Sequence, residues 1–286
     1  MARVLAITVV VVAAQWIGVA ITGSLALAAD AGHQLTDALG ITLALVAARI
    51  AARPASPSRT FGYLRAEVLS AVVHAALIAV MCVVLAAQSW QRWRNPVDVP
   101  GGGVMIFAAV GLLANLAGVA LLRSSSRTNL NVRTAFLDVA ADAATSAVVL
   151  VSGAIMAATG LTKLDVIATA VVIAAILIRT WGVIAEAVQI LMEGAPANVS
   201  PADVRAAALS VPGVMDVHDV HVWAVSPESP MVTAHVVVDQ DLHDSGGAGR
   251  VLDQLESRLD SQFGVSHTTF QIEHPDHQLH EHPRHD

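Results

Sequence analysis

The sequence predicts an α-helical membrane protein with six transmembrane helices, followed by a small cytoplasmic α+β domain. Of its 286 residues, 55% are hydrophobic and only 14% are charged, which is too apolar for an ordinary soluble protein. The apolar residues form long runs of about 20 residues or more, the length that crosses a bilayer. These runs lie at residues 4–23, 25–48, 66–90, 103–122, 134–158 and 165–190.

The first run is expected to remain as a transmembrane helix. It is too long for the core of a signal peptide, lacks a convincing cleavage site and leads directly into the second run. Most basic residues near the runs fall on one side of the predicted membrane, namely Arg3, Arg49, Arg53, Arg59, Arg65, Arg123, Arg127 and Arg133. The other side has Arg92, Arg94 and Lys163. The positive-inside rule therefore predicts that both termini lie in the cytoplasm. We expect a multi-pass protein of the plasma (inner) membrane.

A soluble domain is predicted after Glu193. The segment "GAPANVSPADV" supplies a helix start, with Ser200 as N-cap and Pro201 at the first helical position. The following pattern predicts a helix at 202–210, strands at 214–225 and 231–239, a helix at 249–263 and a strand at 267–273. The predicted domains are thus 1–193 in the membrane, 194–274 in the cytoplasm and a histidine-rich disordered tail at 275–286.

Ionisable residues occur at bilayer depth in two of the apolar runs. His33 and Asp37 are four residues apart and share a helix face, and Asp138 and Asp142 repeat this spacing in the fifth run. Each such group costs at least about 2.5 to 3.5 kcal/mol at the membrane centre. Two antiparallel helices would bring together one imidazole and three carboxylates, whose repulsion a divalent cation compensates. Four nitrogen and oxygen ligands suit a tetrahedral ion such as zinc, and protons compete for the same atoms.

Other polar residues in the runs have simpler interpretations. A single polar pair in a transmembrane helix is often an interhelical hydrogen bond, but two such pairs on separate helices disfavour that role for the four residues above. His74 and Asn115 are lone polar residues, for which we favour a structural role. Asp30 lies either at the outer mouth of a path or near the aqueous boundary, and the sequence does not separate these two.

Several segments together resemble the cation diffusion facilitator family, in its zinc-exporter-like branch. They are "SLALAADAGHQLTDALG", "RTFGYLRAEVLSA", "NLNVRTAFLDVAAD", "LMEGAP" and "DVHDVHVWAV". The resemblance implies six transmembrane helices, a metallochaperone-like α-β-β-α-β domain, a homodimer and metal/proton antiport by alternating access. It implies a transport site at His33, Asp37, Asp138 and Asp142. It also implies metal ligands in the cytoplasmic domain at His218, His235, His267 and Glu273.

Asp138 departs from the pattern of this branch, whose members usually have histidine there. A carboxylate in place of an imidazole makes the site harder and more negative by one charge, which helps oxygen-seeking ions compete with zinc. We therefore expect broader selectivity than strict zinc transport.

The histidines of the predicted strands raise a geometric difficulty. Residues an odd number apart in a strand face opposite sides, so His218 and His221 cannot share a face without a bulge. A five-residue hairpin loop pairing Val225 with Met231 would place His221, and not His218, opposite His235. In the last strand, six residues separate His267 from Glu273, or about 20 Å. These two residues then serve separate ions, or a site at a dimer seam or strand end.

The sequence predicts a secondary transporter that exports divalent transition metals in exchange for protons. Zinc is the first candidate, followed by cadmium, cobalt, manganese and iron, with no prosthetic cofactor. An enzyme is disfavoured because there is no H-E-x-x-H helix and no free glutamate beside the cluster. No basic patch suggests nucleic acid. The alternative is a membrane-anchored metal sensor or buffer.

An ion pair is also predicted at the cytoplasmic face. Arg65 opens the third run and Glu193 follows the sixth. The resemblance places such positions close together beneath the dimer, where opposite charges would steady the seam. The expected partners of the chain are thus a second copy of itself, divalent metal ions, protons and membrane lipid.

Overall fold

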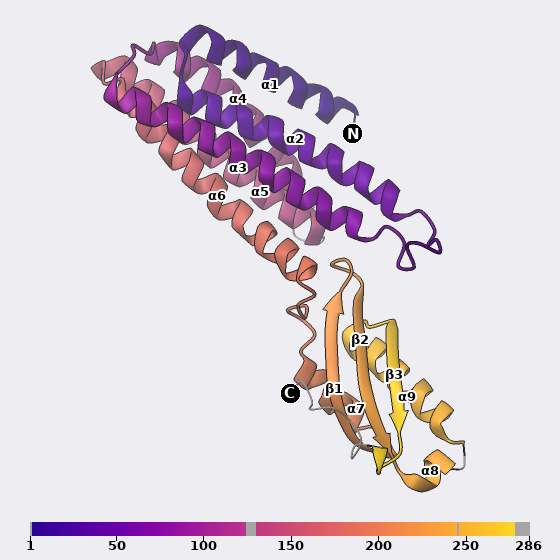
Figure 1. Ribbon diagram of the computed structural model, residues 1–286. Helices are drawn as coiled ribbons and strands as arrows, with labels where there is room; N and C mark the ends of the chain where they lie inside the picture. The colour runs from indigo at the N-terminus through magenta and orange to yellow at the C-terminus, as the bar shows by residue number, and fades with distance from the viewer. Residues whose placement is uncertain (1, 124–129, 245, 278–286) are drawn as a thin grey trace. The chain divides into compact units, whose positions relative to one another are not determined.

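The computed structural model describes residues 2–123, 130–244 and 246–277 (Figure 1). The chain divides into two compact units. The first comprises Met1–Leu43 and Val73–Val183, and the second comprises Ala44–Val72 and Ile184–Asp286. The predicted disordered tail falls mostly on residues 278–286, which lie outside the described residues.

Long apolar helices account for the N-terminal two thirds of the chain. They are α1 (Ala2–Thr22), α2 (Leu25–Ala51), α3 (Arg65–Arg94), α4 (Gly101–Leu122), α5 (Leu130–Thr159) and α6 (Lys163–Leu191). Among the described residues, α2 to α6 contain five segments long and apolar enough to cross a membrane, and α1 contains a shorter apolar segment, Val11–Thr22. The predicted helical membrane domain is confirmed, and its helix ends lie within about one turn of the predicted ones.

Small residues allow the helices of the first unit to approach closely. A Cβ on Gly153 of α5 would lie 2.8 Å from the backbone nitrogen of Met105 in α4, and one on Gly18 of α1 would meet the ring of Phe107. Close approach over glycine is a common way for membrane helices to pack, because lipid supplies no hydrophobic drive between them. Large apolar side chains such as Ile178 and Trp181 are 77% and 70% exposed, as expected for positions that face lipid.

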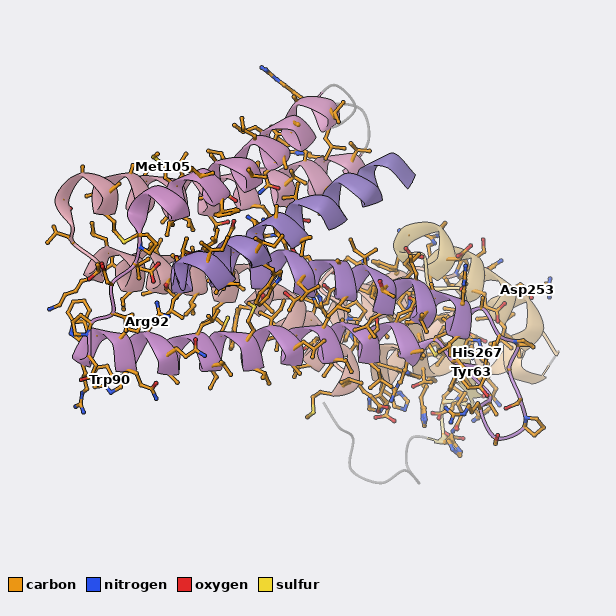
Figure 2. The ribbon with its side chains drawn as sticks, turned by 90° about the horizontal axis from the view of Figure 1, so that it is seen from above. Tyr63, Trp90, Arg92, Met105, Asp253 and His267 are labelled. Carbon is orange, nitrogen blue, oxygen red and sulfur yellow. The ribbon has the colours of Figure 1, made fainter. Side chains whose placement is uncertain are left out.

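A buried carboxylate ties the start of α6 to the start of α2. Asp165 is 1% exposed and accepts hydrogen bonds from the backbone N–H groups of Leu25 (2.8 Å) and Ala26 (3.2 Å) and from the Ser24 hydroxyl. It also pairs with Arg92 at 3.4 Å. A negative charge at a helix N-terminus satisfies otherwise unpaired N–H groups and complements the helix dipole. Arg92 and Trp90 lie at the same end of α3 (Figure 2).

The second unit contains a three-stranded sheet with helices on one face. Besides one end each of α2, α3 and α6, it contains α7 (Pro201–Leu209), β1 (Val214–Ala224), β2 (Pro230–Val238), α8 (Gln240–Asp244), α9 (Ala248–Phe263) and β3 (His267–Glu273). The strand order is β1-β2-β3, with β1 antiparallel and β3 parallel to β2. Val217, Val236 and Leu255 are completely buried between the sheet and α9. The predicted α+β class is confirmed, and the short helix α8 is an addition to it.

The hairpin register differs from the predicted one. Met231 pairs with Trp223 rather than Val225, because the Val225 N–H donates to Ser229 O and closes a tighter turn. A bulge between His218 and His221 then shifts the pairing further, and Asp219 within it has a φ of 50°.

The prediction that His221 lies opposite His235 is therefore wrong. His218 pairs with His235, and His221 pairs with Thr233. The bulge decides this outcome, since it inserts an unpaired stretch that reverses which side chains face the partner strand.

Candidate metal sites

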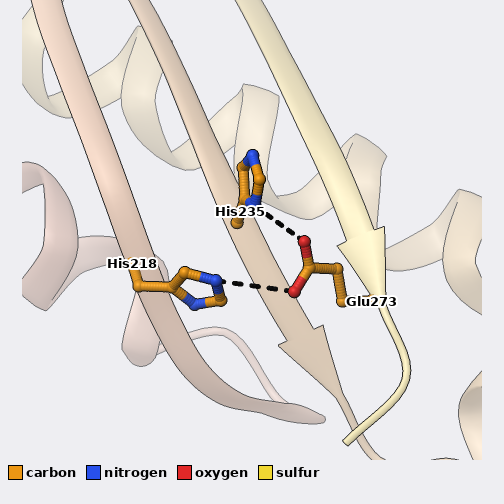
Figure 3. Close-up of side chains that lie close together, drawn as sticks. All are labelled: His218, His235 and Glu273. Carbon is orange, nitrogen blue, oxygen red and sulfur yellow. Dashed lines mark ion pairs between the residues drawn. The ribbon is translucent and has the colours of Figure 1, made fainter. Parts of the chain in front are cut away.

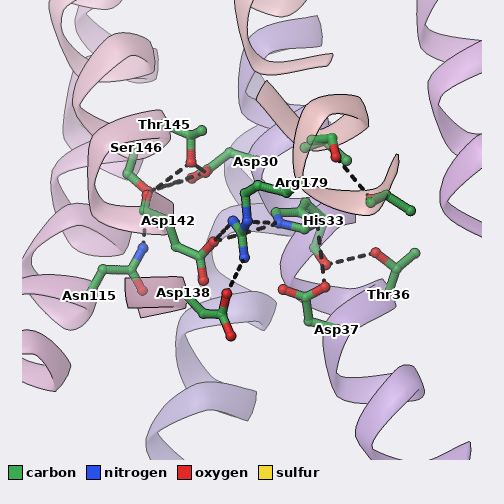
Figure 4. Close-up of polar contacts among 12 residues, drawn as sticks. Asp30, His33, Thr36, Asp37, Asn115, Asp138, Asp142, Thr145, Ser146 and Arg179 are labelled. Atoms are coloured by element: carbon green, nitrogen blue, oxygen red, sulfur yellow. Dashed lines mark hydrogen bonds and ion pairs between the residues drawn. The ribbon is translucent and has the colours of Figure 1, made fainter. Parts of the chain in front are cut away.

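A cluster of ligand-type side chains lies among the apolar helices of the first unit. Helix α2 contributes His33 and Asp37, and α5 contributes Asp142 (Figure 4). His33 Nδ1 is 3.5 Å from Asp37 Oδ1, and His33 Nε2 is 3.6 Å from Asp142 Oδ1. One ligand atom from each of the three residues lies within 4.8 Å of the others. The i, i+4 spacing in α2 is what brings His33 and Asp37 to one face.

This geometry suits a divalent ion. Zinc binds imidazole nitrogen and carboxylate oxygen at about 2.0 to 2.2 Å, so tetrahedral ligand atoms lie a little over 3 Å apart. An imidazole binds one ion through one nitrogen, and the 3.6 Å between His33 Nε2 and Asp142 Oδ1 needs only a small contraction to match. Asp37 Oδ1 faces the other ring nitrogen, Nδ1, at 3.5 Å, so a side chain must shift before all three residues can bind the same ion. His33 is 5% exposed, and its Nδ1 has no hydrogen-bond partner among the described residues. The three residues therefore supply ligand atoms for one cation, which they can hold together after their side chains rearrange.

The structure places Asp138 beside this cluster rather than within it. Its side chain is 58% exposed, and its Oδ1 lies 3.4 Å from Arg179 NH2. The role of Asp138 as a fourth ligand stays a prediction.

Arg179 of α6 also enters the site (Figure 4), although it was not predicted from the sequence. Its NH1 is 2.6 Å from Asp142 Oδ1 and 3.3 Å from His33 Nε2. The signal was present in "AAILIRTWGVI", a lone charge in an apolar run. An arginine at that depth is costly unless it meets acidic partners, and the same reasoning that selected the acids would have selected it.

Two lone polar residues are also located by the structure. His74 Nε2 lies 3.8 Å from Asp37 Oδ1, and a Cβ on Gly40 would run into its imidazole ring. His74 thus lies next to the cluster, and the structural role favoured for it from the sequence stays a prediction. Asn115 donates a hydrogen bond to Ser146 Oγ at 3.2 Å, which agrees with an interhelical role.

Asp30 occupies a buried polar network. It is 1% exposed, and its Oδ2 accepts from Gln15 Nε2 at 2.8 Å and from Ser146 Oγ at 2.9 Å. Its Oδ1 accepts from Thr145 Oγ1 at 3.3 Å. Helices α1 and α5 thus enclose this carboxylate and supply its donors, which holds it inside the helix bundle.

A second cluster lies on the sheet of the second unit (Figure 3). His235 Nδ1 is 2.7 Å from Glu273 Oε1, and His218 Nε2 is 3.5 Å from Glu273 Oε2. Ligand atoms of these three residues lie within 4.8 Å of one another. The bulge described above places His218 here. In the parallel pairing of β2 with β3, Glu273 pairs with Val237, which puts it two residues along from His235 on the same face of the sheet.

His267 is not brought to this cluster. It begins β3, where it pairs with Met231, and its ring packs edge-on against Phe61 with centroids 5.7 Å apart. The extended strand separates it from Glu273, as the rise per residue predicts.

The predicted pair of Arg65 and Glu193 is in contact. Arg65 NH2 lies 2.9 Å from Glu193 Oε1, with the two side chains 40% and 63% exposed. Glu193 has a φ of 59°, a left-handed conformation that ends α6 in the way a C-terminal glycine often does. The role of this pair at a dimer seam stays a prediction.

Helices long and apolar enough to cross a membrane hold a buried imidazole beside two partly buried carboxylates, and a small α+β domain follows them. These features define a membrane protein that handles metal cations. The chain belongs to the cation efflux family. Residues 1–192 match the family model of the cation efflux transmembrane domain, and residues 196–275 match that of the cytoplasmic domain of cation efflux proteins. It is accordingly a cation efflux transporter and not an enzyme.

Curated relatives cover most of the chain. The metal cation efflux system protein CzcD of Cupriavidus metallidurans is 34% identical over 94% of this chain and 84% of its own length. The zinc transporter ZitB of Escherichia coli is 37% identical over 90% of this chain and 82% of its own. The cadmium, cobalt and zinc/H(+)-K(+) antiporter of Bacillus subtilis is 31% identical over 90% of this chain and 83% of its own.

Proposed function

We propose that this protein exports zinc and related divalent metal ions from the cytoplasm in exchange for protons. The observation that carries the proposal is the cluster of His33, Asp37 and Asp142 among membrane-spanning helices. Ligands at that depth fit a transported ion better than a stored one, because a buffer or sensor gains nothing from the cost of placing acids within the bilayer.

Exchange with protons follows from the ligand chemistry. A metal ion binds neutral imidazole and ionised carboxylate, so its arrival expels protons from these atoms and its departure lets protons return. A relative named as a zinc/H(+)-K(+) antiporter supports monovalent cations as the exchanged species. The same atoms thus bind either the metal ion or protons, and the metal ion and the protons exclude each other there.

Zinc is proposed as the main cargo, with a broader range than zinc alone. Names of relatives include zinc, cadmium and cobalt. One imidazole among carboxylates is a harder ligand set than two imidazoles, which favours competition by cobalt, manganese and iron.

The proposed setting is a homodimer in the plasma membrane with both termini in the cytoplasm. The basic residues of the loops support that orientation. A small three-stranded domain gains stability from pairing with a second copy, which supports the dimer.

Reconstituted vesicles test the proposal. With the purified protein in liposomes and an outwardly directed proton gradient, zinc should accumulate and the lumen should lose protons in step. Competition by cadmium, cobalt and manganese should lower zinc uptake. Zinc binding without accumulation would favour the sensor or buffer and overturn transport.

A charge exchange tests the Arg65–Glu193 pair. Reversal of either charge should lower transport modestly, because an exposed pair contributes only about 0 to 1 kcal/mol. The double exchange Arg65→Glu with Glu193→Arg should partly restore both transport and the dimer fraction seen by light scattering. Simple addition of the two losses in the double variant would argue against a functional contact.

A further inference from the structure

Arg179 makes three contacts at the candidate transport site. Its NH1 is 2.6 Å from Asp142 Oδ1 and 3.3 Å from His33 Nε2, and its NH2 is 3.4 Å from Asp138 Oδ1. Arginine has donors only, so the carboxylates and the imidazole nitrogen are acceptors here. Figure 4 shows the guanidinium lying between these groups.

Those contacts use the atoms that a metal ion needs. Asp142 Oδ1 and His33 Nε2 face each other at 3.6 Å, and both are already engaged by the same arginine nitrogen. An ion bound to both at about 2.0 to 2.2 Å would occupy the space next to that nitrogen. The guanidinium and a metal ion held by these two atoms exclude each other.

Charge counting indicates where the guanidinium goes when metal is bound. Asp37, Asp138 and Asp142 carry three negative charges when ionised. A divalent ion neutralises two of them and leaves one negative charge. Arg179 supplies the missing positive charge, since it stays protonated under all ordinary conditions. Asp138 is its natural partner in that state, because it already contacts NH2 and lies outside the cluster of three ligands.

Building on the proposed function, we propose that Arg179 is a tethered cation of the transport site. Without metal, it lies on Asp142 and His33 and neutralises part of the acid cluster. Metal entry displaces it onto Asp138, which leaves His33, Asp37 and Asp142 to the ion. Arg179 is thus a positioning residue that limits metal affinity and aids release, and Asp138 is the acceptor for the displaced arginine rather than a ligand.

Zinc affinity of the purified full-length protein provides the test, with competition against a chromophoric chelator as the measurement. Arg179→Gln should bind zinc more tightly, by about 5- to 150-fold if the coupling is of ordinary size. Asp138→Asn should bind more weakly, because the displaced arginine loses its acceptor. In the Arg179→Gln background, the loss caused by Asp138→Asn should shrink.

Two results would overturn the inference. One is zinc affinity in Arg179→Gln that is equal to or weaker than wild type. The other is an equal loss from Asp138→Asn with and without Arg179, which would make Asp138 a direct ligand. Arg94→Gln is the matched control, because Arg94 lies on α3 against the Trp90 ring. It should bind zinc as the wild type does.

Two further comparisons keep the result interpretable. If Arg179→Gln does not fold, the double variant Arg179→Gln with Asp138→Asn replaces it, since it removes one charge of each sign. The double variant should bind zinc more tightly than Asp138→Asn alone, because it has no arginine to displace. Equal affinities in that comparison would overturn the inference.

Asp142→Ala separates the inference from the proposed function. The cluster of His218, His235 and Glu273 can still bind zinc in this variant, so the number of zinc ions bound per chain is counted. The same number as in the wild type removes the proposed site, whereas one ion fewer, with no effect of Arg179→Gln on zinc affinity, removes the tethered cation alone.

Discussion

Asp142→Ala is expected to abolish zinc transport while the protein remains folded. The substitution removes one of the three clustered ligands, and it takes away the carboxylate closest to Arg179. The loss should exceed the roughly 10- to 100-fold that removal of an outer-shell partner costs a metal site. Zinc uptake into vesicles under a proton gradient measures it.

The stability of this variant is expected to change little. Removal of a carboxylate relieves its repulsion with Asp37 but also ends the 2.6 Å pair with Arg179, and these effects oppose each other. Asp142→Asn, which keeps the shape, should lose transport to the same extent. Thr159→Ala at the end of the same helix is the control and should transport normally. Thr159 is exposed, and its hydroxyl bonds only to Ile155 O and to the Leu161 N–H of the turn that follows. Wild-type uptake by either Asp142 variant would contradict the site assignment.

Asp165→Ala is expected to cause the largest loss of stability. The carboxylate is 1% exposed and satisfies the Ser24 hydroxyl and the N–H groups of Leu25 and Ala26, besides its pair with Arg92. Its removal leaves buried donors and a partly buried cation uncompensated, at a cost of about 3 to 5 kcal/mol. Thermal unfolding in detergent should show a much lower midpoint.

Graded variants check the cause. Asp165→Asn keeps an acceptor for the α2 N-terminus but loses the charge, so its midpoint should fall between those of the wild type and Asp165→Ala. Asp98→Ala removes an exposed acid from the segment between α3 and α4 and should have little effect. An unchanged midpoint in Asp165→Ala would show that the network carries no stability.

Local pattern was sufficient to predict the helices and the sheet elements. Runs of apolar residues long enough to cross a bilayer predict α2 to α6, because backbone groups in lipid must be satisfied within the helix itself. The i, i+4 spacing likewise predicts that His33 and Asp37 share a face, since it follows from helix geometry alone. Both features depend only on residues near one another in the chain.

The strand register needed the tertiary structure. Alternation predicts which residues can share a face, but one inserted residue reverses the pattern beyond it. Because of the bulge at Asp219 and the tight turn at Ser229, His218 lies opposite His235, where the alternation predicted His221. Neither feature has a clear signal in the sequence "DVHDVHVWAVSPESP".

The sequence by itself determined the class of fold and the presence of ligand-type residues at bilayer depth, because the cost of burying charge in lipid restricts such residues to sites that compensate them. Only the tertiary structure decided how those residues are grouped. It joined Arg179 of α6 to Asp142 of α5, left Asp138 beside the cluster and enclosed Asp30 with Gln15 and Ser146. Contacts between separate helices depend on how whole helices pack and rotate against one another, and residue spacing within one helix does not contain that information.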